Sequence, residues 1–130
     1  GYTYGISAGI MFYPDSGLLA ISTETDNEYV EPLIQEVYHE IDRLHQEPVS
    51  AEELTIVRNY MLGEMCRSYE SPFSLSDAWI FIATSGLDDD YFSRSLLAVN
   101  EVTSMEIQDL AQRYLCKETL KEVIAGKKLS

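Results

Sequence analysis

The first thirteen residues, GYTYGISAGIMFY, alternate between apolar and small or polar side chains, and this alternation constrains the fold more than any other feature. A period of two predicts a strand with one face on a hydrophobic core. Pro14 to Gly17 (PDSG) is typical of a turn, and a β-prone run, Leu18 to Thr23, follows it. We therefore expect a β-hairpin whose apolar face is covered by the helices that come later in the chain. The apolar side consists of Tyr4, Ile6, Ala8, Ile10 and Phe12.

A helix is predicted directly after the hairpin. Thr25 and Glu28 have the spacing of a capping box, in which each side chain accepts the other residue's backbone N–H. Pro32 lies inside the pattern and is comfortable only in a first turn, so a start nearer Tyr29 is the alternative. Apolar residues then recur on one face until Pro48: Val30, Leu33, Ile34, Val37, Ile41 and Leu44.

Four further helices carry similar start and stop signals. Capping boxes begin at Ser50 and Thr103, each with apolar residues at the positions of a hydrophobic staple. Ser71 precedes Pro72, which suits the first position of a helix, and Gly86 suits its C-terminal end. Trp79 and the methionines fall at helical spacing, so core packing is expected for them. These helices are predicted from Ser50 to about Arg67, from Ser71 to Gly86, around Phe92 to Leu97 after Asp88–Asp90, and from Thr103 through Leu115.

The C-terminal run Leu120 to Ala125, followed by Gly126, predicts a third strand, and Lys127 to Ser130 a frayed tail. The fold class is therefore α+β, with an antiparallel sheet of hairpin plus C-terminal strand packed against about five helices. No linker or internal repeat divides residues 1–130, so one domain is expected. Three strands are few for five helices, which suggests that further strands precede a chain that begins within a strand pattern.

The formal net charge of −13, with a pI near 4.3, disfavours binding to nucleic acid or to anionic lipid, because both would be repelled. A solvated acidic surface is the ordinary interpretation of this charge. Cys66 and Cys116 stand fifty positions apart without a CxxC pair. They are interpreted as free, partly buried thiols, with a disulfide as the alternative.

No catalytic or metal-binding motif emerges from the residues alone. His39 and His45 are six positions apart, which places them about 120° apart around a helix, too far for a shared zinc. Neither HExxH nor HxxEH is present, and no GxSxG motif surrounds a serine. The acidic pairs, such as Glu52-Glu53, fall at helix starts, where the helix dipole stabilises them. We therefore predict no metal site and no catalytic residue in this chain.

Several segments, in order and spacing, resemble the pitrilysin/insulinase-type zinc metallopeptidases. They are GYTYGISA at Gly1, LAISTET at Leu19, PVSAEEL at Pro48, Gly86-Leu87, VTSMEI at Val102, Ala111 and VIAG at Val123. The resemblance covers nearly the whole chain. It implies the later part of a C-terminal unit, itself an incomplete piece of a larger α/β-roll-like domain.

In that family an N-terminal unit carries the zinc motif HxxEH, and a C-terminal unit supplies an Arg and a Tyr that hold the peptide. The family tyrosine lies in a Gly-Tyr pair, which Gly1-Tyr2 matches, while Tyr4 is a weaker neighbour. The resemblance thus implies substrate-binding roles for Tyr2 and Tyr4, with the phenol donating to the substrate carbonyl. The matching Arg would precede Gly1.

The resemblance also implies partners and an alternative function. Zinc would be held by the N-terminal unit of the same protein or by a separate subunit, and this chain alone would be inactive towards a peptide substrate. The alternative is a non-catalytic structural or partner subunit of the processing-peptidase or core-subunit type. An unrelated acidic α+β interaction domain is a weaker alternative. An unpaired sheet edge would also favour self-association of the isolated chain.

Overall fold

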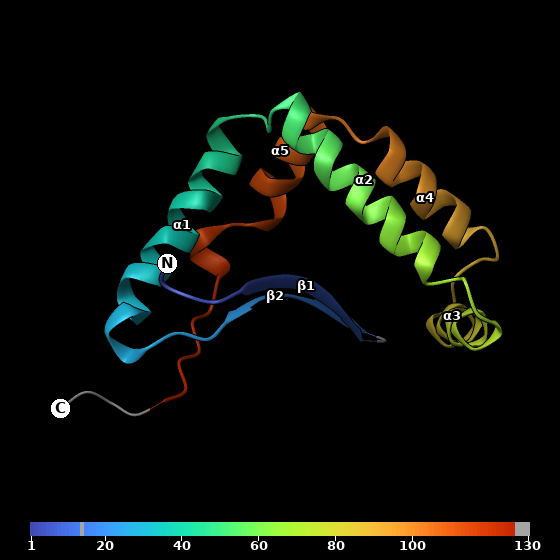
Figure 1. Cartoon of the computed structure of the whole chain (residues 1–130), viewed down its shortest axis with the longest axis horizontal. Coiled ribbons are helices and arrows are strands. Elements are labelled where there is room, and N and C mark those ends of the chain that lie inside the picture. The colour runs from blue at the N-terminus through green and yellow to red at the C-terminus, as the bar shows by residue number, and fades with distance from the viewer. Residues whose placement is uncertain (14, 127–130) are drawn as a thin grey trace. The chain divides into compact units, whose positions relative to one another are not determined.

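The structure of the chain, a computed structural model, describes residues 1–13 and 15–126. It contains two strands and five α-helices, so the α+β prediction is confirmed (Figure 1). The contacts divide the chain into two compact units, Glu47–Leu110 and the remainder on either side of it. No helix in the described part is long and apolar enough to cross a membrane.

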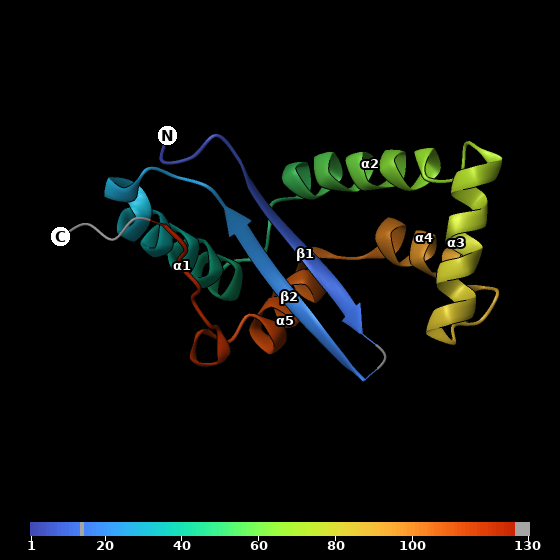
Figure 2. The ribbon, with the colours of Figure 1, turned by 90° about the horizontal axis from the view of Figure 1, so that it is seen from below.

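The predicted hairpin is present. Strand β1 (Ile6–Tyr13) pairs antiparallel with β2 (Ser16–Thr23), from Ile6 opposite Thr23 to Tyr13 opposite Ser16 (Figure 2). β2 begins two residues earlier than the run at Leu18 had suggested, and Pro14 of the expected turn lies outside the described residues. The register gathers the even-numbered residues of β1 and the odd-numbered residues of β2 on one face.

The strands are not buried as expected. Every residue of β1 is exposed, and Ile10 at the centre of the strand retains 60% of its accessible surface. A sheet of two strands offers a narrow surface on which a helix can bury little area. The alternation in the sequence thus identified the strand correctly but not its environment.

Helix α1 (Val30–Gln46) follows a single 3₁₀ turn, Asn27–Tyr29, so its start lies at the later of the two positions considered. Pro32 falls in its first turn, where the missing N–H costs nothing. Leu33 and Ile41 are buried, as is Ala111 near the end of the chain's last α-helix. Among the described residues, these three side chains form the buried core of the unit that contains the hairpin.

Residues after Ala111 run back along α1 from its C-terminal end to its N-terminal end (Figures 1 and 2). His45 Nε2 lies 3.0 Å from the carbonyl oxygen of Ala111, and the amide of Gln112 donates to the carbonyl of His45 (2.8 Å). Further on, Lys117 pairs with Asp42, and the Tyr38 hydroxyl donates to Glu122 (2.8 Å). A short 3₁₀ helix, Lys117–Thr119, lies within this returning segment.

The predicted strand Leu120 to Ala125 does not form in the structure, where the described sheet contains only β1 and β2. β-propensity is realised only when a neighbouring strand supplies hydrogen bonds and cross-strand packing. This segment instead follows α1, with Val123 91% exposed. The C-terminal strand was therefore a wrong prediction, while the hairpin and the helices were right. Lys127 to Ser130 lie outside the described residues.

The second unit contains α2 (Ala51–Arg67), α3 (Pro72–Ser85), α4 (Tyr91–Glu101) and the beginning of α5 (Ser104–Tyr114). Their ends follow the sequence signals. The Ser50 hydroxyl accepts the backbone N–H of Glu53 (3.1 Å), and the Ser71 hydroxyl accepts that of Ser74 (3.0 Å). Gly86 ends α3 in the left-handed conformation, with φ of 65°.

Arg58 joins α2 to the end of α4 within this unit. Its guanidinium donates to the carbonyl oxygens of Val99 (3.1 Å) and Val102 (2.5 Å), which the helix leaves without an N–H partner. Tyr69 and Phe92 meet edge to face at 4.8 Å, and burial raises the pKa of the Tyr69 phenol. Ile82 of α3 is the buried hydrophobic residue of this unit.

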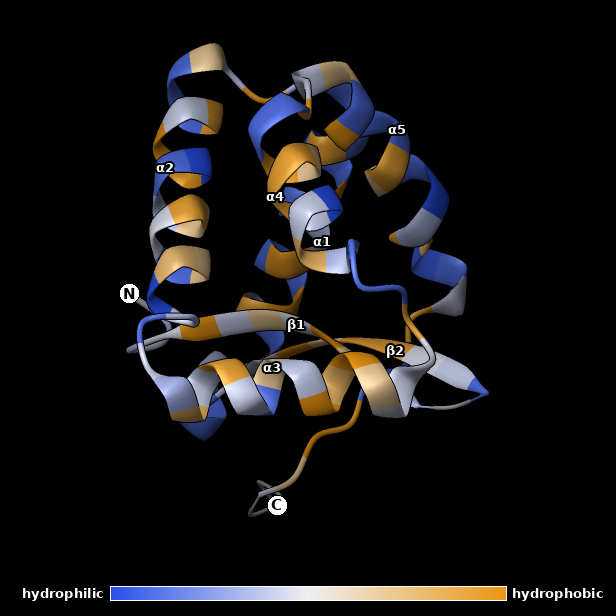
Figure 3. Ribbon diagram, turned by 90° about the vertical axis from the view of Figure 1, so that its right-hand side faces the viewer, coloured by the Kyte–Doolittle hydropathy of each residue, from blue (hydrophilic) through white to orange (hydrophobic). Residues whose placement is uncertain are grey.

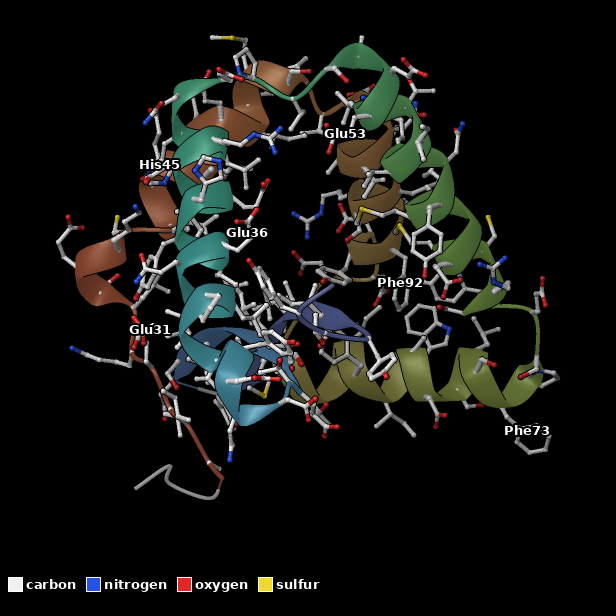
Figure 4. The ribbon with its side chains drawn as sticks, turned by 60° about the vertical axis from the view of Figure 1, so that its left-hand side comes forward. Glu31, Glu36, His45, Glu53, Phe73 and Phe92 are labelled. Carbon is white, nitrogen blue, oxygen red and sulfur yellow. The ribbon has the colours of Figure 1, made fainter. Side chains whose placement is uncertain are left out.

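The predicted apolar stripes of the second unit are largely exposed. α3 is hydrophobic along much of its length (Figure 3), yet Trp79 retains 46% of its surface. Phe73 projects away from α3, whereas the ring of Phe92 contacts that of Tyr69 (Figure 4). Helical spacing thus located the helices, but core packing of Trp79 and Met61 was a wrong prediction.

Candidate functional site

The two tyrosines implied by the family resemblance lie just before β1, at the open end of the hairpin. The Tyr2 ring rests near the ring of Tyr29, with centroids 5.8 Å apart and planes inclined by 40°, and Tyr2 remains 43% exposed. Tyr4 is fully exposed. The structure thus places both phenols within reach of a ligand but assigns them different surroundings.

Three threonine hydroxyls connect the segment before β1 to the end of β2. Thr3 donates to the carbonyl of Glu24 (2.7 Å), and Thr23 donates to the carbonyl of Gly5 (2.9 Å). Thr25 donates to the carbonyl of Tyr2. We call Thr3, Thr23 and Thr25 the hydroxyl clasp. It extends the connection between the two chain segments beyond the last ladder pair, Ile6 with Thr23.

An open hollow of about 560 Å³ lies beside the hydroxyl clasp. Ser7 and Ser22 face each other across the strands within it, with their hydroxyl oxygens 3.0 Å apart. Glu24 is the one carboxylate among the lining residues, and no lining residue is basic. The residues that line the hollow are Thr3, Tyr4, Gly5, Ile6, Ser7, Ser22, Thr23 and Glu24.

The hollow offers hydroxyl groups and exposed backbone, which are groups that can hydrogen-bond to an extended peptide. It contains no imidazole, thiol or amine that could act as a base or nucleophile. The hollow can therefore contact and orient a ligand through these polar groups.

Among the described residues, no group of three or more His, Cys, Asp or Glu side chains could hold a metal ion. His39 is exposed on α1, whereas His45 (Figure 4) is half-buried and contacts the carbonyl of Ala111. Both cysteines are free thiols, Cys66 exposed and Cys116 half-buried. The expectation that both thiols are partly buried was therefore wrong for Cys66.

Charged and aromatic side chains also gather where the returning segment lies against α1, and there they connect the two chain segments. Lys117 Nζ lies 5.5 Å from the centre of the Tyr38 ring and pairs with Asp42. The hydrogen bond from the Tyr38 hydroxyl to Glu122 raises the pKa of that phenol. These contacts hold the returning segment against α1.

Sequence reasoning missed the hydroxyl clasp. Thr25 was interpreted as a helix cap, but its hydroxyl donates to Tyr2, and Asp26 occupies the N-cap position without a side-chain bond. The capping box of Thr25 and Glu28 was thus wrong. The available signal was the recurrence of threonine at positions 23 and 25, opposite the start of the predicted first strand.

A family model described as the Peptidase M16 inactive domain matches residues 1–61, the stretch that contains the hairpin, α1 and the start of α2. Comparison with curated proteins and with solved structures gives no match. The matched stretch includes Tyr2, Tyr4 and the whole hydroxyl clasp. Residues 1–61 are therefore similar to the inactive domain of the M16 peptidases, which is consistent with the C-terminal, non-zinc unit of the pitrilysin/insulinase type.

Proposed function

We propose that residues 1–130 form a single C-terminal segment of a pitrilysin-like unit that lines the substrate chamber of a zinc metalloendopeptidase. The zinc and its general base come from an N-terminal unit of the same protein or from a separate subunit. This chain contributes peptide contacts and is inactive alone. The observation that carries the proposal is the match to the inactive M16 domain over a stretch whose tyrosines lie exposed at the hairpin's open end.

Tyr2 is the principal contact in this proposal. Its phenol would donate a hydrogen bond to the substrate carbonyl oxygen and so stabilise the negative charge that develops there during hydrolysis. Tyr4 lies beside the hollow and contacts the peptide at a neighbouring position. The hydroxyls that line the hollow are suited to the backbone of an extended peptide.

Tyr2→Phe in the zinc peptidase assembled with this chain tests the role of Tyr2. Loss of one transition-state donor should lower kcat by about a hundredfold, as is typical of such groups. Zinc content, measured by atomic absorption, should stay the same because no zinc ligand is altered. Turnover is measured with an internally quenched fluorogenic peptide.

Tyr13→Phe is the matched control, because Tyr13 is an exposed tyrosine at the opposite end of β1. It should leave turnover unchanged. If Tyr2→Phe also left turnover unchanged, Tyr2 would not contact the reacting carbonyl. The alternative of a non-catalytic structural or partner subunit would then be favoured, and deleting this chain should still disrupt the assembly.

We further propose that the isolated chain self-associates through the hairpin. The strands carry no charged residue that would discourage pairing, and their apolar face is exposed. Sedimentation at rising concentration should detect dimers or larger species, more so at high salt, which screens the net charge of −13. Ile10→Lys on the exposed face should restore the monomer. A strictly monomeric wild-type chain at high concentration would contradict this proposal.

A further inference from the structure

The backbone of Tyr2 is fixed by a residue far along the sequence. The Thr25 hydroxyl donates to the carbonyl oxygen of Tyr2 across the open end of the hairpin. Thr25 and Thr3 are half-buried, whereas Thr23 is exposed. Chain segments beyond the last ladder pair are ordinarily the first to fray. This bond therefore restrains the residue whose side chain has the proposed peptide contact.

The side chain of Tyr2 has a second restraint. Its ring lies 5.8 Å from that of Tyr29, a tilted arrangement typical of favourable aromatic pairs. Tyr29 closes the 3₁₀ turn that leads into α1, and its backbone N–H is bonded to the carbonyl of Asp26 (2.9 Å). The ring of Tyr2 thus packs near Tyr29, whose backbone is fixed by its hydrogen bond to Asp26.

Thr25 does not cap the helix that follows it, although its position relative to Glu28 is that of a capping box. A threonine three residues before a glutamate usually caps the helix. In the described structure no bond joins Thr25 to Glu28, and the N-cap residue Asp26 makes no side-chain cap bond. The chain leaves that helix start without a side-chain cap, while the Thr25 hydroxyl is bonded to Tyr2. Helix capping therefore does not explain the hydrogen bond from Thr25 to Tyr2.

We propose that Thr25 and Tyr29 are positioning residues for Tyr2, Thr25 through the Tyr2 carbonyl and Tyr29 through the ring. The inference rests on the proposed function of Tyr2. Together they hold the phenol in one orientation before the peptide arrives, so that little conformational freedom is lost on binding. Neither residue touches the substrate.

The test uses Thr25→Val, which removes the donor and keeps the shape, in the zinc peptidase assembled with this chain. We expect kcat/KM for the quenched peptide to fall about tenfold, because small misplacement of an aligned group is costly. Thr25→Ser retains the hydroxyl and should restore most of the activity. Thr55→Val is the control, since the exposed Thr55 hydroxyl donates only to its own helix at Ala51 (2.7 Å).

Two readouts separate positioning from a general structural role. In a Tyr2→Phe background, Thr25→Val should cost nothing further, because the positioned phenol is absent. In protein labelled with 3-fluorotyrosine, the ¹⁹F resonance that Tyr2→Phe removes should shift or broaden in Thr25→Val and return in Thr25→Ser. Tyr29→Leu should move the same resonance through loss of the ring contact, and it serves where Thr25→Val does not fold.

An equal loss of activity in both backgrounds, or a Tyr2 resonance unmoved by Thr25→Val and Tyr29→Leu, would overturn the positioning role. Failure of the proposed function has a different signature. In that case Tyr2→Phe leaves turnover unchanged, while the ¹⁹F resonance still reports whether Thr25 and Tyr29 fix the ring.

Discussion

Two helix entrances in this chain carry the same sequence pattern and use it differently. At Thr103 to Glu106 the capping box forms in both directions. The Thr103 N–H donates to Glu106 (2.8 Å), and the Glu106 N–H donates to the Thr103 hydroxyl (3.2 Å). At Thr25 to Glu28 the threonine hydroxyl instead donates to Tyr2, twenty-three residues earlier. The Thr103 hydroxyl is thus bonded within its own helix start, whereas the Thr25 hydroxyl is bonded to the segment before β1.

The difference has a sequence signal in the residue before the threonine. Val102 precedes Thr103 and can form a hydrophobic staple with Ile107, and Val49 precedes Ser50 with Leu54 in the matching position. Both of these entrances are capped. Thr25 follows Glu24, a charged residue that cannot form a staple, and this entrance is not capped by its threonine. The staple therefore separates the two uses of the pattern in this chain.

The largest expected effect on this comparison comes from paired substitutions, Thr103→Ala and Thr25→Ala. Removing the Thr103 cap should destabilise the start of α5 by about 1 kcal/mol, the usual cost of a lost N-cap. Thr25→Ala should leave the start of α1 unchanged, because its hydroxyl bonds no helix N–H. Amide hydrogen exchange, read at the N–H of Glu106 and across the first turn of α1, measures both.

Replacing each threonine by serine keeps the hydroxyl, so these two variants serve as controls. Thr103→Ser should retain slow exchange at Glu106, and Thr25→Ser should behave as the wild type. Faster exchange throughout the first turn of α1 in Thr25→Ala would remove the contrast, because Thr25 would then contribute to both the helix and the hairpin.

The locality of each signal explains how much of this fold the sequence predicted. Gly86 and Ser71 act on atoms within a few residues, so their roles could be read correctly. The same holds for the hairpin, whose strands are joined by two residues. The C-terminal run Leu120 to Ala125 needs a distant partner strand, which its own residues cannot indicate, and the structure places it along α1 instead.

The candidate site likewise contains residues that the sequence could indicate and residues that it could not. Tyr2 and Tyr4 were proposed as peptide contacts through the family resemblance alone, since a tyrosine at a strand start has no distinctive chemistry of its own. Thr25 was missed because its local pattern pointed to a cap, whereas its partner is determined by how the hairpin returns. The buried side of α3 was misjudged for a related reason. Helical spacing predicts a face, but burial of Trp79 depends on a neighbour that spacing does not specify.

The smallest expected effect concerns the charge of the true capping box. Hydrogen bonds from the Thr103 backbone N–H and hydroxyl lower the pKa of the Glu106 carboxyl below its ordinary value. Because the folded pKa is depressed, this group's contribution to stability is present above the unfolded pKa. It is lost as the pH falls through the folded pKa.

A ¹³C titration of the carboxyl groups checks this by locating the Glu106 midpoint in the wild type and in Thr103→Ala. The variant lacks the hydroxyl donor, so the midpoint of Glu106 should rise, and exchange at the start of α5 should depend less on acid pH. Thr25→Ala, used as the matched control, should leave the Glu106 midpoint unchanged. A midpoint of Glu106 that does not move in Thr103→Ala would mean that the carboxylate gains nothing from the Thr103 hydroxyl. The hydrogen bond from the Thr103 backbone N–H, which remains in the variant, would then account for the lowered pKa of Glu106.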